Sequence, residues 1–191
     1  FVDDTNFSTA SKSPSQNVTV LNRAAVIAVD WARNDEATFE KTKTELTKTE
    51  LIHHSPGRSD LSDYHIIFNG EDIYPSESVK WLGVLINSKL SGAPHIKARA
   101  SSAGRALNAA MALTHATWGL KPIMVRDLAL ATVFPRADYR VTSFLPLPVS
   151  ALKPLECVNK CVAHCITGGY RTASRAALEK DAAILPVHLR L

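Results

Sequence analysis

The run Val79-Lys80-Trp81-Leu82-Gly83-Val84-Leu85-Ile86 lies just before the chain changes from predicted strands to predicted helices. This run is apolar at both alternating sets of positions, which is typical of a strand that is covered on both faces. Gly83 within it predicts a bulge or a close approach by another backbone. Upstream, three apolar residues lead into Asn69-Gly70, a dipeptide typical of a tight hairpin turn. Residues 64–90 are therefore predicted to be β-structure.

Beyond His95 the apolar positions recur at helical spacing. We expect an alanine-rich helix that ends at Trp118-Gly119, followed by three more helices. The predicted helical ranges are 94–117, 123–134, 151–166 and 175–182. An earlier helix is predicted from Pro14 to Arg33-Asn34-Asp35, a length of about five turns.

The order of these elements predicts an α+β fold with a subdomain boundary near residue 92. Residues 1–92 would hold the β-hairpins and one helix, and residues 93–191 would be all helical. Hydrophobic residues make up 46% of the 191 and charged residues 21%, close to the averages for globular domains. The first residue is Phe1 rather than Met, from which we expect a processed or incomplete chain.

Composition also predicts the location of the chain. No window of about 18 apolar residues exists, so we expect no segment that spans a membrane. We expect no secretory leader, and the three cysteines are an odd number that suits a reducing compartment. The expected location is therefore intracellular, in the cytoplasm or the nucleus. The net charge of +4 is compatible with a phosphate-bearing partner and equally with an ordinary cytosolic protein.

An acidic pair stands near the start of the sequence. In Phe1-Val2-Asp3-Asp4 the two aspartates lie among β-prone residues, as in a tight turn between strands. The tetrapeptide resembles the aromatic-x-Asp-Asp box of reverse transcriptases. Later phrases follow in the order found in polymerases of non-LTR (LINE-type) retrotransposons, closest to the fungal ones. They are Trp31-Ala32-Arg33-Asn34, Phe39, the Lys-Thr-Glu-Leu-Ile-His run that ends at His53, Ser78–Val84, Trp118-Gly119, Leu155–Val158 and Ile166–Thr172.

The resemblance implies a C-terminal fragment of an RNA-directed DNA polymerase, a nucleotidyltransferase. Residues 1–92 would be the rear part of the palm with its primer-grip hairpin, and residues 93–191 the helical thumb and connector. The partners in the intact enzyme would be an RNA template, a DNA primer, and the upstream palm and fingers. Asp3 would be a catalytic ligand of Mg²⁺, with Asp4 beside it. The family has a companion aspartate upstream of the box, so residues 1–191 alone are expected to be inactive.

The resemblance also implies a catalytic lysine behind the box, and two residues compete for that role. Lys43-Thr44-Glu45-Leu46 recurs as Lys48-Thr49-Glu50-Leu51, where the family has a single such phrase. The family lysine protonates or steadies the leaving pyrophosphate. Lys43 fits by its distance from Phe39, and Lys48 fits by the Leu-Ile-His that follows it, so both stay candidates. A solvated lysine at a strand edge is the alternative for either one.

The primer grip of this family corresponds to Trp81, Leu82 and Gly83. Glycine permits close approach, so the backbone at Gly83 is a candidate for contact with the primer sugar-phosphate. The apolar neighbours of Trp81 predict that its side chain is part of the core rather than a stacking platform for a base.

Three basic residues, Lys97, Arg99 and Arg105, interrupt the alanine-rich helix. They are candidates for contacts to the phosphates of a duplex, which position a protein without reading sequence. An ordinary solvated helix face is the alternative.

Departures from the family pattern suggest a decayed copy. Besides the duplicated phrase, Asn87 stands where the family usually has aspartate, and Phe144 stands where it often has tryptophan. Three hypotheses stay open: a polymerase fragment that is inert alone, a non-catalytic nucleic-acid-binding remnant, and a pseudogene product without function. We also expect surplus apolar surface, which the upstream palm would normally cover.

Overall fold

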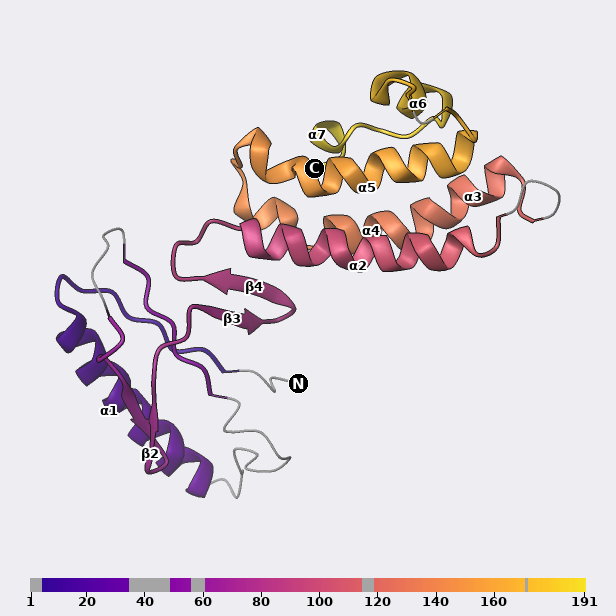
Figure 1. The fold of residues 1–191 in the computed structure, drawn as a ribbon. Helices are drawn as coiled ribbons and strands as arrows, with labels where there is room; N and C mark the ends of the chain where they lie inside the picture. The colour runs from indigo at the N-terminus through magenta and orange to yellow at the C-terminus, as the bar shows by residue number, and fades with distance from the viewer. Residues whose placement is uncertain (1–4, 35–48, 56–60, 115–118, 171) are drawn as a thin grey trace. The chain divides into compact units, whose positions relative to one another are not determined.

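The computed structural model describes residues 5–34, 49–55, 61–114, 119–170 and 172–191 (Figure 1). The fold over these residues is α+β, with helices and two small antiparallel sheets. The chain divides into two compact units, an N-terminal unit of residues 1–90 and a C-terminal unit of residues 91–191. The sequence pattern predicted this boundary near residue 92. Within the described ranges, no helix has both the length and the apolar character needed to cross a membrane.

The N-terminal unit begins with helix α1, Pro14–Asn34, as the sequence predicted. Pro14 suits the first helical position because its ring presets φ and the amide it lacks would have no partner there. One stripe of the helix buries Ala25, Ala28 and Ala32, whose small side chains allow close packing. This stripe therefore forms the inner side of the helix.

Strands β1 (Ile66–Phe68) and β2 (Glu71–Ile73) form the first hairpin of this unit and lie against α1 (Figure 1). Asn69 and Gly70 have φ of 52° and 84°, as both central residues of a type I′ turn require, so the predicted turn is confirmed. A small core forms where the hairpin meets the helix. Its buried members are Ala25, Leu51, Ile66, Phe68 and Ile73.

Strands β3 (Ser78–Trp81) and β4 (Val84–Asn87) form a second hairpin. The apolar pattern predicted a single strand here, whereas the family resemblance implied a hairpin. The prediction of one continuous, covered strand here is wrong. Leu82 and Gly83 have φ of 47° and 78° and reverse the chain, so the expected bulge at Gly83 is a turn. A run with apolar residues at both alternating sets of positions fits a covered strand and a hairpin equally well, because a hairpin pairs the two halves with each other.

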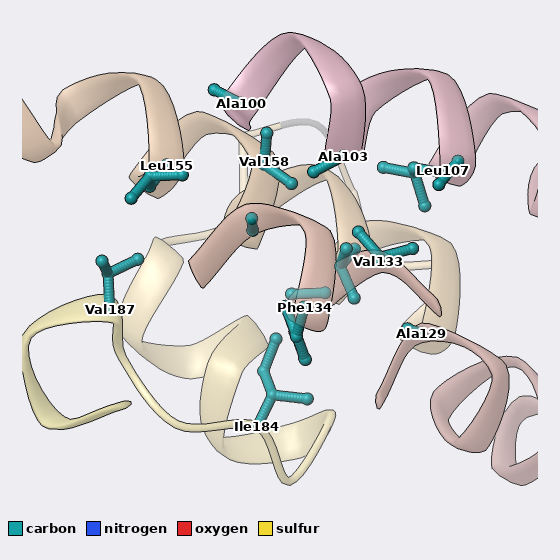
Figure 2. Close-up of a cluster of buried hydrophobic side chains, with 14 of the residues drawn as sticks. Ala100, Ala103, Leu107, Ala129, Val133, Phe134, Leu155, Val158, Ile184 and Val187 are labelled. Atoms are coloured by element: carbon teal, nitrogen blue, oxygen red, sulfur yellow. The ribbon is translucent and has the colours of Figure 1, made fainter. Parts of the chain in front are cut away.

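The C-terminal unit is a bundle of helices in which α2 and α5 lie side by side (Figure 1). Its elements are α2 (Ala93–Met111), α3 (Pro122–Leu128), the π turn η1 (Ala129–Val133), α4 (Phe134–Asp138), the 3₁₀ turn η2 (Val141–Phe144), α5 (Val149–Thr167), α6 (Arg175–Asp181) and α7 (Val187–Arg190). Figure 2 shows how side chains from α2, η1, α4, α5 and α7 gather in one interior. Leu155 and Val133 are completely buried there.

Helix α2 ends earlier than predicted. It stops at Met111, whose carbonyl accepts a 2.8 Å hydrogen bond from the Thr114 hydroxyl. The chain then turns back, and the Leu120 amide donates to the Leu113 carbonyl at 3.1 Å. The predicted end at Trp118-Gly119 is therefore wrong, because these local bonds close the helix first.

The next helical segment runs from Pro122 to Asp138 and contains the π turn, whereas the sequence predicted a plain helix over 123–134. Pro135 explains the wider turn. It has no amide to donate, and its ring would collide with the Ala131 carbonyl in a regular α-helix. One widened turn lets the chain continue as a helix past the proline.

A buried polar cluster fixes the end of the chain onto this bundle. The Asn159 amide donates to Glu179 Oε1 at 2.6 Å, and Arg190 donates to Asn159 Oδ1 at 2.7 Å. Arg190 also donates to both carboxylate oxygens of Asp138, and its guanidinium lies 4.1 Å from the centroid of the Phe134 ring. Helices α4, α5, α6 and α7 are thus joined through groups that satisfy one another.

Candidate nucleic-acid interface

The proposed catalytic and metal-binding residues Asp3, Asp4, Lys43 and Lys48 all lie outside the described residues. Among the residues that are described, no three His, Cys, Asp or Glu side chains gather as a metal site would require. The remaining predicted site residues lie on the β3–β4 hairpin and on helix α2.

The tip of the β3–β4 hairpin carries the three residues predicted to grip a primer. Trp81 forms the last strand pair, with Val84, and Leu82 and Gly83 make the turn. The Trp81 side chain is 39% exposed and Leu82 is 51% exposed, so the prediction that Trp81 belongs to the core is wrong. At the end of a hairpin, few neighbours remain to cover a large ring. The tip thus presents two apolar side chains beside the exposed Lys80.

Leu82 adopts an unfavourable backbone conformation at this tip. A left-handed φ costs an ordinary L-residue roughly 1–2 kcal/mol, whereas glycine adopts it freely. Burial does not offset the cost, because more than half of the Leu82 side chain is exposed. Strained, exposed residues of this kind concentrate at functional sites.

Helix α2 presents a basic face made by Lys97, Ser101 and Arg105, all exposed and spaced four residues apart. Residues four apart share one side of a helix, and Lys97 and Arg105 lie about 12 Å apart along the axis. The Arg105 guanidinium donates to the Ser101 hydroxyl at 3.0 Å, which orients it along the face. Among the described atoms, Gly104 has nothing within 4 Å of the position a Cβ would take, so the bundle's own packing does not require glycine there.

Arg99 lies on another side of α2. Two residues along a helix rotate the side chain by about 200° from Lys97. Its guanidinium lies 5.6 Å from the centroid of the Tyr139 ring, a cation–π contact, and its Nε is buried without a hydrogen-bond partner among the described residues. The structure therefore groups Lys97 with Arg105 and directs Arg99 toward α4.

His95 anchors the start of α2. Its ring is fully buried, and Nε2 donates a 2.9 Å hydrogen bond to the Tyr139 carbonyl. Burial lowers the pKa of His95 below its ordinary value, and the nearby charge of Arg99 lowers it further, while the hydrogen bond to the Tyr139 carbonyl opposes the shift. The neutral imidazole therefore holds α2 against the end of α4. Sequence reading gave this residue no role of its own, because a single buried histidine carries no spacing signal.

Gly92 and Phe144 complete this corner of the bundle. Gly92 has a φ of 66°, and a Cβ built on it would lie 2.8 Å from Cγ of the Phe144 ring. Only glycine therefore fits before α2 without displacing that ring. The aromatic ring of Phe144 also lies 5.5 Å from His95, so it covers the buried imidazole.

Charge is divided unevenly between the two units. The C-terminal unit has 13 lysines and arginines against five acidic residues, a formal charge of +8. The N-terminal unit has nine against 13, a formal charge of −4. In the C-terminal unit Asp138, Glu156 and Glu179 lie in ion pairs with arginines, so much of its negative charge is already compensated. Such asymmetry is typical of chains that bind a polyanion with one part.

Comparison with protein-family models, with curated proteins and with solved structures finds no match for this chain. Its function is therefore inferred from its own residues and their geometry.

Proposed function

We propose that residues 1–191 form the rear palm, primer-grip hairpin, thumb and connector of a LINE-type reverse transcriptase of the fungal kind. By themselves these residues hold a primer–template duplex and do not extend it. The observation that supports this best is the β3–β4 hairpin. The resemblance assigns Trp81, Leu82 and Gly83 to the primer grip. Trp81 and Leu82 are exposed at the hairpin tip, and Leu82 has a left-handed backbone conformation whose cost burial does not offset.

The hairpin tip offers three kinds of contact to a nucleic-acid strand. Gly83 has no side chain, so a sugar-phosphate backbone can approach its peptide groups closely. The exposed face of Trp81 suits stacking on a base, which is sequence-tolerant because every base has a π-face. Lys80, the strand residue before Trp81, supplies a positive charge for a phosphate from the other face of the hairpin. Together these contacts would position a primer end without reading its sequence.

The C-terminal unit supports the same proposal through its charge. Lys97 and Arg105 on the basic face of α2 provide two phosphate contacts along one helix. The small residues between them, Ser101 and Gly104, leave room for a duplex to lie against the helix. Binding of this kind releases counterions and therefore weakens steeply as salt rises.

Helix α1 supports the assignment of the N-terminal unit to a palm. Val20, Ile27 and Trp31 recur at helical spacing and are each more than half exposed. This second apolar stripe differs from the buried alanine stripe. A palm helix that packs against further strands in the intact enzyme would show such a stripe.

The proposed inactivity as a polymerase rests on the number of metal-binding carboxylates within residues 1–191. Nucleotide addition in this class uses two divalent ions about 3.5–4 Å apart, held by carboxylates from separate strands. Within residues 1–191 the resemblance supplies only the adjacent pair Asp3 and Asp4. Lys43 and Lys48 remain the two candidates for the pyrophosphate contact.

A second candidate function is a nucleic-acid-binding module with no part in polymerisation. The formal charge of +8 on the C-terminal unit favours it, since that charge serves binding whether or not a palm is present. The two candidates differ at the hairpin: a primer grip needs Trp81 and Leu82, whereas a simple polyanion-binding surface does not.

A salt titration of duplex binding tests the proposal. Purified residues 1–191 would be titrated with a fluorescent RNA–DNA primer–template between about 50 and 200 mM salt, a range over which phosphate contacts lose much of their affinity. We expect the double substitution Lys97→Ala and Arg105→Ala to weaken binding and to reduce the salt slope by roughly 2, about 0.9 for each phosphate contact. The matched control, Lys12→Ala with Arg23→Ala, removes the same charge from exposed positions of the N-terminal unit.

Two outcomes would overturn the proposal. Absence of measurable binding at the lowest salt would remove both candidate functions. Primer extension in Mg²⁺ that Asp3→Ala abolishes would show that residues 1–191 are an active polymerase by themselves.

A further inference from the structure

We draw no further inference here: the strongest candidate, the exposed apolar stripe of Val20, Ile27 and Trp31 on helix α1, carries nothing beyond the proposed palm, because nothing in the part of the chain that the structure describes shows what covers it.

Discussion

The two hairpins of the N-terminal unit share a turn geometry and differ in the residue that begins the turn. Both close with a two-residue loop in which both residues have positive φ. The β1–β2 hairpin uses Asn69-Gly70, and the β3–β4 hairpin uses Leu82-Gly83. Asparagine tolerates the left-handed conformation because its short polar side chain bonds locally, and leucine does not.

The surroundings of the two hairpins differ as well. Ile66, Phe68 and Ile73 of the first hairpin are buried against α1, and the Ile67 amide donates to Asn22 Oδ1 of that helix at 2.8 Å. No residue of β3 or β4, all of which the structure describes, is fully buried. The first hairpin thus has a favourable first turn residue and buried side chains, whereas the second has neither.

This difference is what the proposed function would lead one to expect of the two hairpins. Sequences usually agree with their fold at every level, and departures concentrate at functional sites. The β1–β2 hairpin agrees at every level and serves stability. The β3–β4 hairpin departs at its tip, where Trp81 and Leu82 are exposed, and the proposed function gives it a role in binding. Substitutions should therefore affect stability in one hairpin and affinity in the other.

The largest effect is expected from Phe68→Ala in the first hairpin. Phe68 is 8% exposed within the small core, and removal of a buried phenylalanine side chain costs about 3–5 kcal/mol. Amide hydrogen exchange of α1, β1 and β2 in the full chain measures the loss. The matched control is Ile67→Ala on the same strand, where the side chain is 52% exposed and the expected change is within about 0.5 kcal/mol. Similar losses for both variants would contradict the assignment of this hairpin to stability.

The next effect is expected from Trp81→Ala in the second hairpin, and it concerns affinity. Stacking on a base contributes about 1–3 kcal/mol, so affinity for the primer–template should fall by roughly 5- to 150-fold. Protection of α1 and β1 from hydrogen exchange should stay unchanged, because Trp81 is not part of their core. Tyr74→Ala is the control, since Tyr74 is an exposed aromatic that directly follows β2. Equal losses of affinity in the two variants would favour the simple polyanion-binding surface.

Much of the fold was predictable where the signals are local. Pro14 marks the start of α1, and Asn69-Gly70 marks the first turn. Each of these signals acts within a few residues of the structure it specifies. The α+β class follows from their order along the chain.

The rest depended on information that no short window contains. The first residue of the second turn is Leu82, and leucine rarely adopts a left-handed conformation. The local sequence around Leu82-Gly83 therefore looked like the middle of a strand rather than a turn. The hydrogen bonds among Asp138, Asn159 and Arg190 join residues up to 52 positions apart, and no local sequence pattern predicts them.

The candidate site was predictable to the same limited extent. The sequence prediction grouped Arg99 with Lys97 and Arg105, whereas in the structure Arg99 lies on another side of α2 over the Tyr139 ring. Helical spacing alone could have made this separation. The apolar pattern did not predict the exposure of Trp81, because that exposure follows from the turn at Leu82-Gly83, which the pattern alone did not indicate. Asp3, Asp4, Lys43 and Lys48 remain predictions, since they lie outside the described residues.

The smallest effect is expected when the two turns exchange their first residues. Asn69→Leu should reduce the hydrogen-exchange protection of β1 and β2 by about 1 kcal/mol, the cost of a left-handed leucine. Leu82→Asn should increase the protection of β3 and β4 by a similar amount, because asparagine relieves that cost. The same Leu82→Asn variant should bind primer–template more weakly, since it removes an apolar side chain from the tip.

In the Leu82→Asn variant, hydrogen-exchange protection should rise while affinity for primer–template falls. This opposite movement is expected only if the Leu82 side chain contacts nucleic acid. A stabilised hairpin with undiminished affinity would mean that the left-handed Leu82 has no role in contact with nucleic acid. A hairpin that loses protection instead would mean that Leu82 stabilises the second hairpin through its own packing. In that case the two hairpins would both serve stability, and the contrast between them would disappear.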